Sequence, residues 1–182
     1  MAIKRLDLLR ELLPAVKRVA LTGPMYLPEL EAATGRLREA SQRLGFEPKV
    51  VDTGASTQVS AIEDAIKEGA QALLLLHNYS ALGQHITGEQ VVRLTIEARI
   101  PAIFAESEMV DAGGLMSYGT NLLEDVRRAV DMLAKVLRGA KPAELPIDQA
   151  SRFELVVNLK TARAIGIRVP PSILLRADRV IE

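Results

Sequence analysis

Short apolar runs alternate with longer amphipathic stretches through the first 105 residues of the chain. Four runs have the length and composition of buried strands, and they are Lys17–Thr22, Lys49–Asp52, Ala72–Leu76 and Ile100–Ala105. Apolar residues at helical spacing predict helices over Leu6–Leu13, Pro28–Leu44, Ser60–Glu68 and Gly88–Arg99. Strands and helices that alternate in this way predict the α/β class, with a parallel sheet covered by helices on both faces and right-handed crossovers.

Composition narrows the range of functions. The 182 residues suit one domain with a sizeable core, and the formal net charge is zero. A balanced charge, with only 3% aromatic residues, argues against a nucleic-acid partner. The chain has no Cys and only two His, His77 and His85, so we expect no disulfide and no Cys- or His-rich metal site.

The chain carries no sequence signal for a membrane or for export. No apolar run reaches the ~18 residues that a membrane helix needs. Charged side chains interrupt the N-terminal stretch, which therefore lacks the apolar core of ~7–15 residues found in signal peptides. If Met1 is the natural start, this pattern predicts a cytoplasmic protein.

Polar and aromatic loops follow the predicted strands, whereas the strands themselves are apolar. Ligands of open parallel sheets bind beyond the carboxyl ends of the strands, and a few convergent polar groups suit a small molecule. The ligand-binding candidates are Thr22, Gly23, Met25 and Tyr26 after the first strand, His77, Asn78 and Tyr79 after the third, and Glu106 after the fourth.

Each polar candidate also has a structural interpretation. Asn78 could stabilise a turn, Glu106 could cap the following helix, and His77 could be a structural hydrogen-bonding residue. Glu106 and Glu108 are two residues apart, so on a helix they would not share a face as an acid/base pair.

The sequence shows no catalytic motif and no cofactor motif. No Ser or Thr has a His partner in a recognisable hydrolase motif, and no phosphate-binding glycine loop follows the first strand. Gly113-Gly114 follows a helical stretch, which indicates a hinge or turn. We therefore expect no catalytic residue, no bound metal and no cofactor.

The C-terminal third carries ordered motifs. They are A-G-G-L-M-S-Y-G at 112–119, G-A-K-P-A-E-L-P at 139–146, and V-V-N-L-K-T-A-R-A-I-G-I-R-V-P-P-S-I-L-L-R-A-D at 156–178. With them, the chain from about Leu8 onward resembles the C-terminal part of the substrate-binding components of ABC transport systems. That family is related to receptors for tryptophan, tyrosine and branched-chain amino acids.

The resemblance implies one lobe of a two-lobed clamp with the type I periplasmic-binding-protein fold. Residues 1–182 would form this single lobe, and segment 114–147 would return to a first lobe that the chain lacks. Asn78 falls near the family's Asp-Asn pair and Glu106 near an acidic position, whereas His77 replaces a residue that is commonly acidic. The implied function is non-catalytic binding of a small polar or amino-acid-like ligand in the periplasm, with an ABC permease as partner.

The helix expected over residues 122–137 has an unusually wide apolar face. Without a first lobe this face needs a partner, so we expect a homodimer through the helix; the alternative is that it folds back onto its own sheet. An alternative function is a stand-alone sensory or regulatory module in the cytoplasm. A receiver-like version would need acidic residues where the first strand ends in Thr22-Gly23, and a small doubly wound enzyme is the third possibility.

Overall fold

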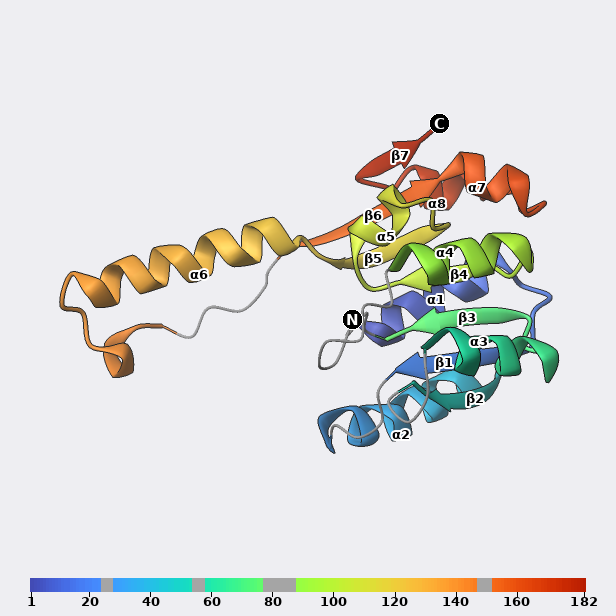
Figure 1. Cartoon of the computed structure of the whole chain (residues 1–182), viewed down its shortest axis with the longest axis horizontal. Helices are drawn as coiled ribbons and strands as arrows, with labels where there is room; N and C mark the ends of the chain where they lie inside the picture. Colours follow the sequence, from blue (N-terminus) through green and yellow to red (C-terminus); the bar gives the residue numbers. More distant parts are fainter. Residues whose placement is uncertain (24–27, 54–57, 77–87, 147–151) are drawn as a thin grey trace.

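The computed structural model describes residues 1–23, 28–53, 58–76, 88–146 and 152–182 (Figure 1). Its strands form one seven-stranded sheet in the order β2-β1-β3-β4-β5-β6-β7. The strands are β1 (Arg18–Gly23), β2 (Glu47–Asp52), β3 (Ala72–Leu75), β4 (Ala102–Phe104), β5 (Met116–Thr120), β6 (Phe153–Asn158) and β7 (Arg179–Ile181). Strands β1 to β5 run parallel, β6 is antiparallel to β5, and β7 is parallel to β6.

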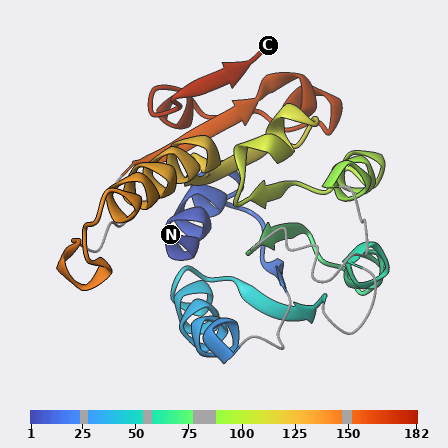
Figure 2. The ribbon, with the colours of Figure 1, turned by 60° about the vertical axis from the view of Figure 1, so that its left-hand side comes forward.

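Helices cover both faces of the sheet, as Figure 2 shows. The described helices are α1 (Ala2–Leu12), α2 (Pro28–Arg43), α3 (Gln58–Lys67), α4 (Gly88–Glu97), α5 (Ser107–Asp111), α6 (Leu122–Leu137), α7 (Leu159–Ala164), α8 (Pro171–Leu174) and the short 3-10 helix η2 (Pro142–Glu144). Alternate residues of β3 belong to different cores: Leu74 belongs to the core that includes side chains of α1, α2, α7 and α8, whereas Leu73 and Leu75 belong to the core that includes side chains of α3 and α4.

The α/β class and the mostly parallel sheet are confirmed. The four predicted strands are all present, with ends that differ from the prediction by at most two residues. The apolar pattern did not predict β5, and the antiparallel β5–β6 pair adds a second strand direction to the expected parallel sheet. Strands β6 and β7 complete the sheet from the C-terminal tail.

Two glycines of the A-G-G-L-M-S-Y-G motif allow β5 to pack closely beside β4. A Cβ on Gly119 would lie 1.8 Å from the carbonyl oxygen of Ala105. A Cβ on Gly114 would lie 2.7 Å from both the carbonyl oxygen of Met109 and the ring of Phe104. No larger residue fits either position without displacing backbone or a buried ring, so the motif has a steric cause.

Asn158 and Thr161, both from the V-V-N-L-K-T motif, join the C-terminal tail to α5. The Asn158 side-chain oxygen accepts a hydrogen bond from Thr161 N (3.1 Å) and so caps α7, while Nδ2 donates to the carbonyl oxygen of Val110 (3.4 Å). Thr161 Oγ1 donates to the carbonyl oxygen of Gly113 (2.6 Å). Both side chains are buried, so these residues of the tail motif have a structural role: they hold the C-terminal tail against α5.

Helix α6 projects away from the sheet and does not fold back onto it (Figure 1). The helix begins directly after β5, and none of residues 123–137 is buried. The segment after the helix contains η2, whose residues are exposed. The projecting helix is therefore an arm connected to the body through β5 and the chain that returns to β6.

Candidate functional site

The carboxyl ends of β1, β3 and β4 lie together at one edge of the sheet. Thr22 pairs with Leu75 across β1 and β3, and Leu74 pairs with Ile103 across β3 and β4. Thr22, Gly23 and Glu106 therefore lie at the edge where the sequence predicts a ligand. The other five candidates, Met25, Tyr26, His77, Asn78 and Tyr79, lie outside the described residues.

Thr22 and Gly23 contribute to this edge mainly through their backbone. The carbonyl oxygen of Thr22 accepts a hydrogen bond from Leu76 N (2.9 Å), and that of Gly23 accepts one from Thr53 N (3.0 Å). The Thr22 side chain is fully buried, and its hydroxyl has no hydrogen-bond partner among the residues that the structure describes. The Thr22 side chain is therefore not available at the surface of this edge.

Arg5 is a component of this edge that the sequence interpretation missed. It comes from α1, is 3% exposed, and its Nη1 donates to the carbonyl oxygens of Leu75 (2.8 Å) and Leu76 (3.3 Å). Burial lowers the pKa of the Arg5 guanidinium to about 10, against the opposing effect of the nearby Glu106 carboxylate. Arg5 thus places a buried positive charge at the end of β3, near the acidic residue that follows β4.

A sequence signal for Arg5 did exist. Residues 5, 8, 9 and 12 have the helical spacing of one face, and Leu8, Leu9 and Leu12 of that face are all buried. A charged residue such as Arg5 at the remaining position of this stripe is exceptional, because buried charges need partners. The carbonyl oxygens at the end of β3 are those partners.

Glu106 occupies the N-cap position of α5, yet its side chain makes no capping hydrogen bond. The expected capping role is therefore wrong at the level of the side chain. Glu106 is half-buried and acts electrostatically on Arg5, whereas Glu108 is exposed and acts on Arg179 of β7. The two carboxylates serve different neighbours, in agreement with the sequence argument against an acid/base pair.

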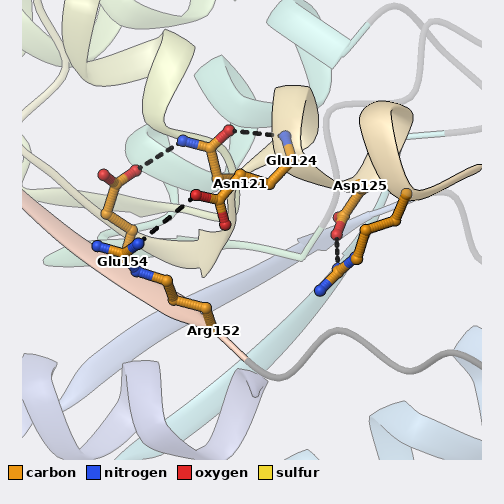
Figure 3. A network of polar contacts seen from close by, with 6 residues as sticks. Asn121, Glu124, Asp125, Arg152 and Glu154 are labelled. Atoms are coloured by element: carbon orange, nitrogen blue, oxygen red, sulfur yellow. Dashed lines mark hydrogen bonds and ion pairs between the residues drawn. The ribbon is translucent and has the colours of Figure 1, made fainter. Parts of the chain in front are cut away.

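A polar network joins the two chain segments at the base of α6 (Figure 3). Asn121 accepts a hydrogen bond from Glu124 N (3.2 Å) and donates to Glu154 of β6 (3.4 Å). Glu124 also forms an ion pair with Arg152 (3.6 Å). Because β5 is parallel to β4, this network lies at the same sheet edge as Glu106.

A cavity of about 470 Å³ lies at the opposite, amino edge, beside Arg18, Phe46, Lys49 and Glu68. Within the described ranges, no three His, Asp or Glu side chains are grouped so as to hold a metal ion. Over the same ranges, no helix has both the length and the apolar character needed to span a bilayer.

Residues 1–181 match the family model described as ABC transporter substrate binding protein. The chain therefore belongs to this family, which binds substrates and does not catalyse reactions. The resemblance predicted from the C-terminal motifs is confirmed, and membership favours a solute receptor over a receiver-like module or an enzyme. A search of curated proteins found no match.

The chain is also similar to solved structures of substrate-binding proteins. One is described as an ABC domain in complex with L-Trp from Streptococcus pneumonia, with a TM-score of 0.83 and 23% identity over 99% of this chain and 62% of that chain. A second is a conserved domain protein from Vibrio cholerae, with a TM-score of 0.84 and 23% identity over 98% of this chain and 60% of that chain.

A third similar structure is the ligand-free, open form of CD0873, a substrate binding protein with adhesive properties from Clostridium difficile. Its TM-score is 0.61, with 21% identity over 97% of this chain and 58% of that chain. At these identities the three structures establish a shared fold. This chain spans about three fifths of the length of each of them.

Proposed function

We propose that this chain is one lobe of the solute receptor of an ABC importer, and that it binds a small amino-acid-like ligand at the carboxyl edge of its sheet. The observation that carries this proposal is the convergence of β1, β3 and β4 on an edge that holds Glu106 near the buried Arg5. A substrate-binding family member with polar groups at this edge fits the usual ligand position of open α/β sheets.

The acidic residue at this edge supports a ligand that carries an ammonium group, as an amino acid does. The Glu106 carboxylate is half-buried and suits the ammonium group of an amino acid, since charge-assisted hydrogen bonds strengthen where water is partly excluded. The loop residues Met25, Tyr26, His77, Asn78 and Tyr79 are the proposed remaining contacts. The L-Trp in the similar structure from Streptococcus pneumonia supports an amino acid as the ligand class.

The proposed setting is the periplasm, with an ABC permease as partner. Family membership supports both, since a substrate-binding protein delivers its ligand to a transporter. The greater length of the similar structures supports the proposal that this chain supplies one lobe of a larger clamp. The expected homodimer concerns a separate surface, the exposed face of α6, and does not depend on ligand binding.

Fluorescence offers a direct test of ligand binding. The chain contains no Trp, so the emission and anisotropy of added L-Trp report only on the ligand itself. We expect saturable binding of L-Trp, or competition with it by another amino acid. Calorimetry over polar, aromatic and branched-chain amino acids extends the test to ligands that do not fluoresce.

Glu106→Gln should weaken binding about tenfold or more, because a hydrogen bond to a charged group contributes roughly 1.5–3 kcal/mol. Glu108→Gln removes an exposed carboxylate two residues away and should leave binding unchanged. Failure of every amino acid class to bind would contradict the ligand assignment. Equal losses in the two variants would contradict the role of Glu106.

A further inference from the structure

The cavity at the amino edge of the sheet lies away from the proposed ligand site. Arg18 and Glu47 are the first residues of β1 and β2, which run parallel and pair with each other. The amino end of β1 faces away from α6 (Figure 1). The volume of the cavity, about 470 Å³, is within the range of roughly 300–1,000 Å³ that is usual for small-molecule sites.

Apolar side chains form one part of the cavity lining. Val19 and Phe46 are buried, and they line the cavity together with Pro48 and Ala70. The Arg10 guanidinium lies over the Phe46 ring, with Cζ 3.8 Å from the ring centroid, and this cation–π contact favours one position of the ring. The apolar part of the lining is therefore formed in the absence of a ligand.

The guanidinium of Arg18 is held on the lining through its Nε atom. Nε donates a hydrogen bond to the carbonyl oxygen of Gly69 (2.6 Å), and a Cβ on Gly69 would lie 3.2 Å from Nη2. Within the part of the chain that the structure describes, Arg18 forms no ion pair. Its Nη groups can therefore bind an anion, and a guanidinium suits the two oxygens of a carboxylate.

Two of the other charged groups on the lining are paired with each other. Lys49 forms an ion pair with Glu68, so their charges offset one another. Glu47 lies opposite Arg18 in the register of β1 and β2, and its charge opposes a bound anion. Glu47 is exposed, however, so water and salt screen this repulsion. Arg18 is thus the cation of the lining that remains for a ligand.

We propose that this cavity is a second binding site, and that it takes a small monocarboxylate with an apolar body. The carboxylate binds the Nη groups of Arg18, and the apolar part lies against Phe46 and Pro48. A largely apolar pocket with one charged group that fixes the orientation is typical of such ligands. The site does not include Glu106, so it is independent of the proposed receptor function.

Titration with phenylacetate tests the site, because this probe combines one carboxylate with an apolar ring. Amide chemical shifts of the isotope-labelled chain locate the binding by NMR. We expect saturable shifts that cluster around Arg18, Phe46 and Glu68. Phenylacetamide, the uncharged analogue, should bind about tenfold more weakly or worse, because hydrogen bonds to a charged group are the stronger ones.

Four variants test the roles of the lining residues. Arg18→Met removes the guanidinium and should weaken phenylacetate binding about tenfold or more. Lys67→Gln is the matched control, because Lys67 is an exposed cation of α3 that does not line the cavity. Ala70→Leu should fill the cavity and block binding while Arg18 stays in place, so the test does not depend on one variant. Glu47→Gln removes the opposing charge and should strengthen binding.

Shifts that do not cluster at the amino edge would overturn the proposal, and so would equal affinities for phenylacetate and phenylacetamide. Weaker binding by Glu47→Gln would contradict the assignment of an anionic ligand. Glu106→Gln should bind phenylacetate as the unchanged chain does, and Arg18→Met should bind L-Trp as the unchanged chain does. Failure of this site and failure of the proposed receptor function are therefore measured separately.

Discussion

Arg5 Nη1 donates a hydrogen bond of 2.8 Å to the carbonyl oxygen of Leu75, the last residue of β3. This bond ties the first helix of the chain to the edge where a ligand is expected. It crosses 70 residues of sequence, so α1 and the end of β3 keep their relative position only while the tertiary fold is intact. Both the folding stability of the body and the geometry of the edge therefore depend on the Arg5 side chain.

Replacement of Arg5 should therefore weaken the fold. Arg5→Met keeps much of the apolar stem but leaves the buried carbonyl oxygens without this donor, and we expect a loss of about 1–3 kcal/mol in the free energy of unfolding. Urea denaturation measures the loss. Lys4→Met changes the exposed neighbouring residue of the same helix and should alter stability little. Equal stability of the two variants would show that the Arg5 bond contributes nothing.

Acidification should loosen the contact between α1 and α8. A hydrogen bond from Ser172, together with Arg176, lowers the pKa of the Glu11 carboxyl below its ordinary value of 4.5. The stabilisation is present above pH 4.5 and is lost as the pH falls through the lower pKa of the folded state. We expect Glu11→Gln to reduce the acid-side decline of the melting temperature, and thermal melts over a pH series measure it. An unchanged decline in this variant would contradict the contribution of the Glu11 contact.

Two glycine substitutions should have opposite effects on stability. Gly119→Ala would drive a Cβ into the carbonyl oxygen of Ala105, so we expect a loss of about 1–3 kcal/mol or more. Gly35→Ala introduces a Cβ with no atom within 4 Å in the helix α2, and should stabilise by roughly 0.5–1 kcal/mol. Thermal melts of both variants check the pair, and a tolerated Gly119→Ala would contradict the close approach of β5 to β4.

The two hydrogen bonds of Asn158 can be separated by mutation. Asn158→Ala removes both the cap of α7 and the bond to Val110, and we expect a loss of about 1–2 kcal/mol or more. Asn158→Asp retains an acceptor for Thr161 N but loses the donor, so its loss should be smaller if the cap dominates. Denaturant titration of both variants decides, and a loss for Asn158→Asp no smaller than that for Asn158→Ala would contradict a dominant cap.

The apolar runs predicted β1, β3 and β4 because these strands lie in the interior of the sheet and are buried almost throughout. The run at Lys49–Asp52 predicted β2 as well, although β2 lies at the edge of the sheet and is only partly buried. Strand β5 escaped prediction because its sequence, M-S-Y-G-T, mixes polar residues with glycine. Its place in the sheet depends on the fit of Gly119 beside Ala105, which is a relation between distant residues. The local periodicity of the sequence cannot predict such a contact.

The candidate site shows a similar division. The sequence predicted where β1, β3 and β4 end, because strand ends can be read from the apolar runs. It did not show that the Thr22 side chain is buried, although Thr22 lies on the same face of β1 as Ala20 and is as deeply buried. The place of Arg5 among the leucines of α1 was a signal that it is buried, but its partner could not be read from the sequence, because a backbone oxygen 70 residues away has no signature in side-chain composition.

Helix α6 is anchored at both ends of its excursion by the paired strands β5 and β6. The rings of Tyr118 and Phe153 lie 5.9 Å apart on this ribbon, and the Asn121–Glu154 hydrogen bond joins its two chains where the helix begins. The base of the arm is therefore held by β6 as well as by β5. A displacement of α6 would act first on β5, the strand adjacent to β4, beside the edge that holds Glu106.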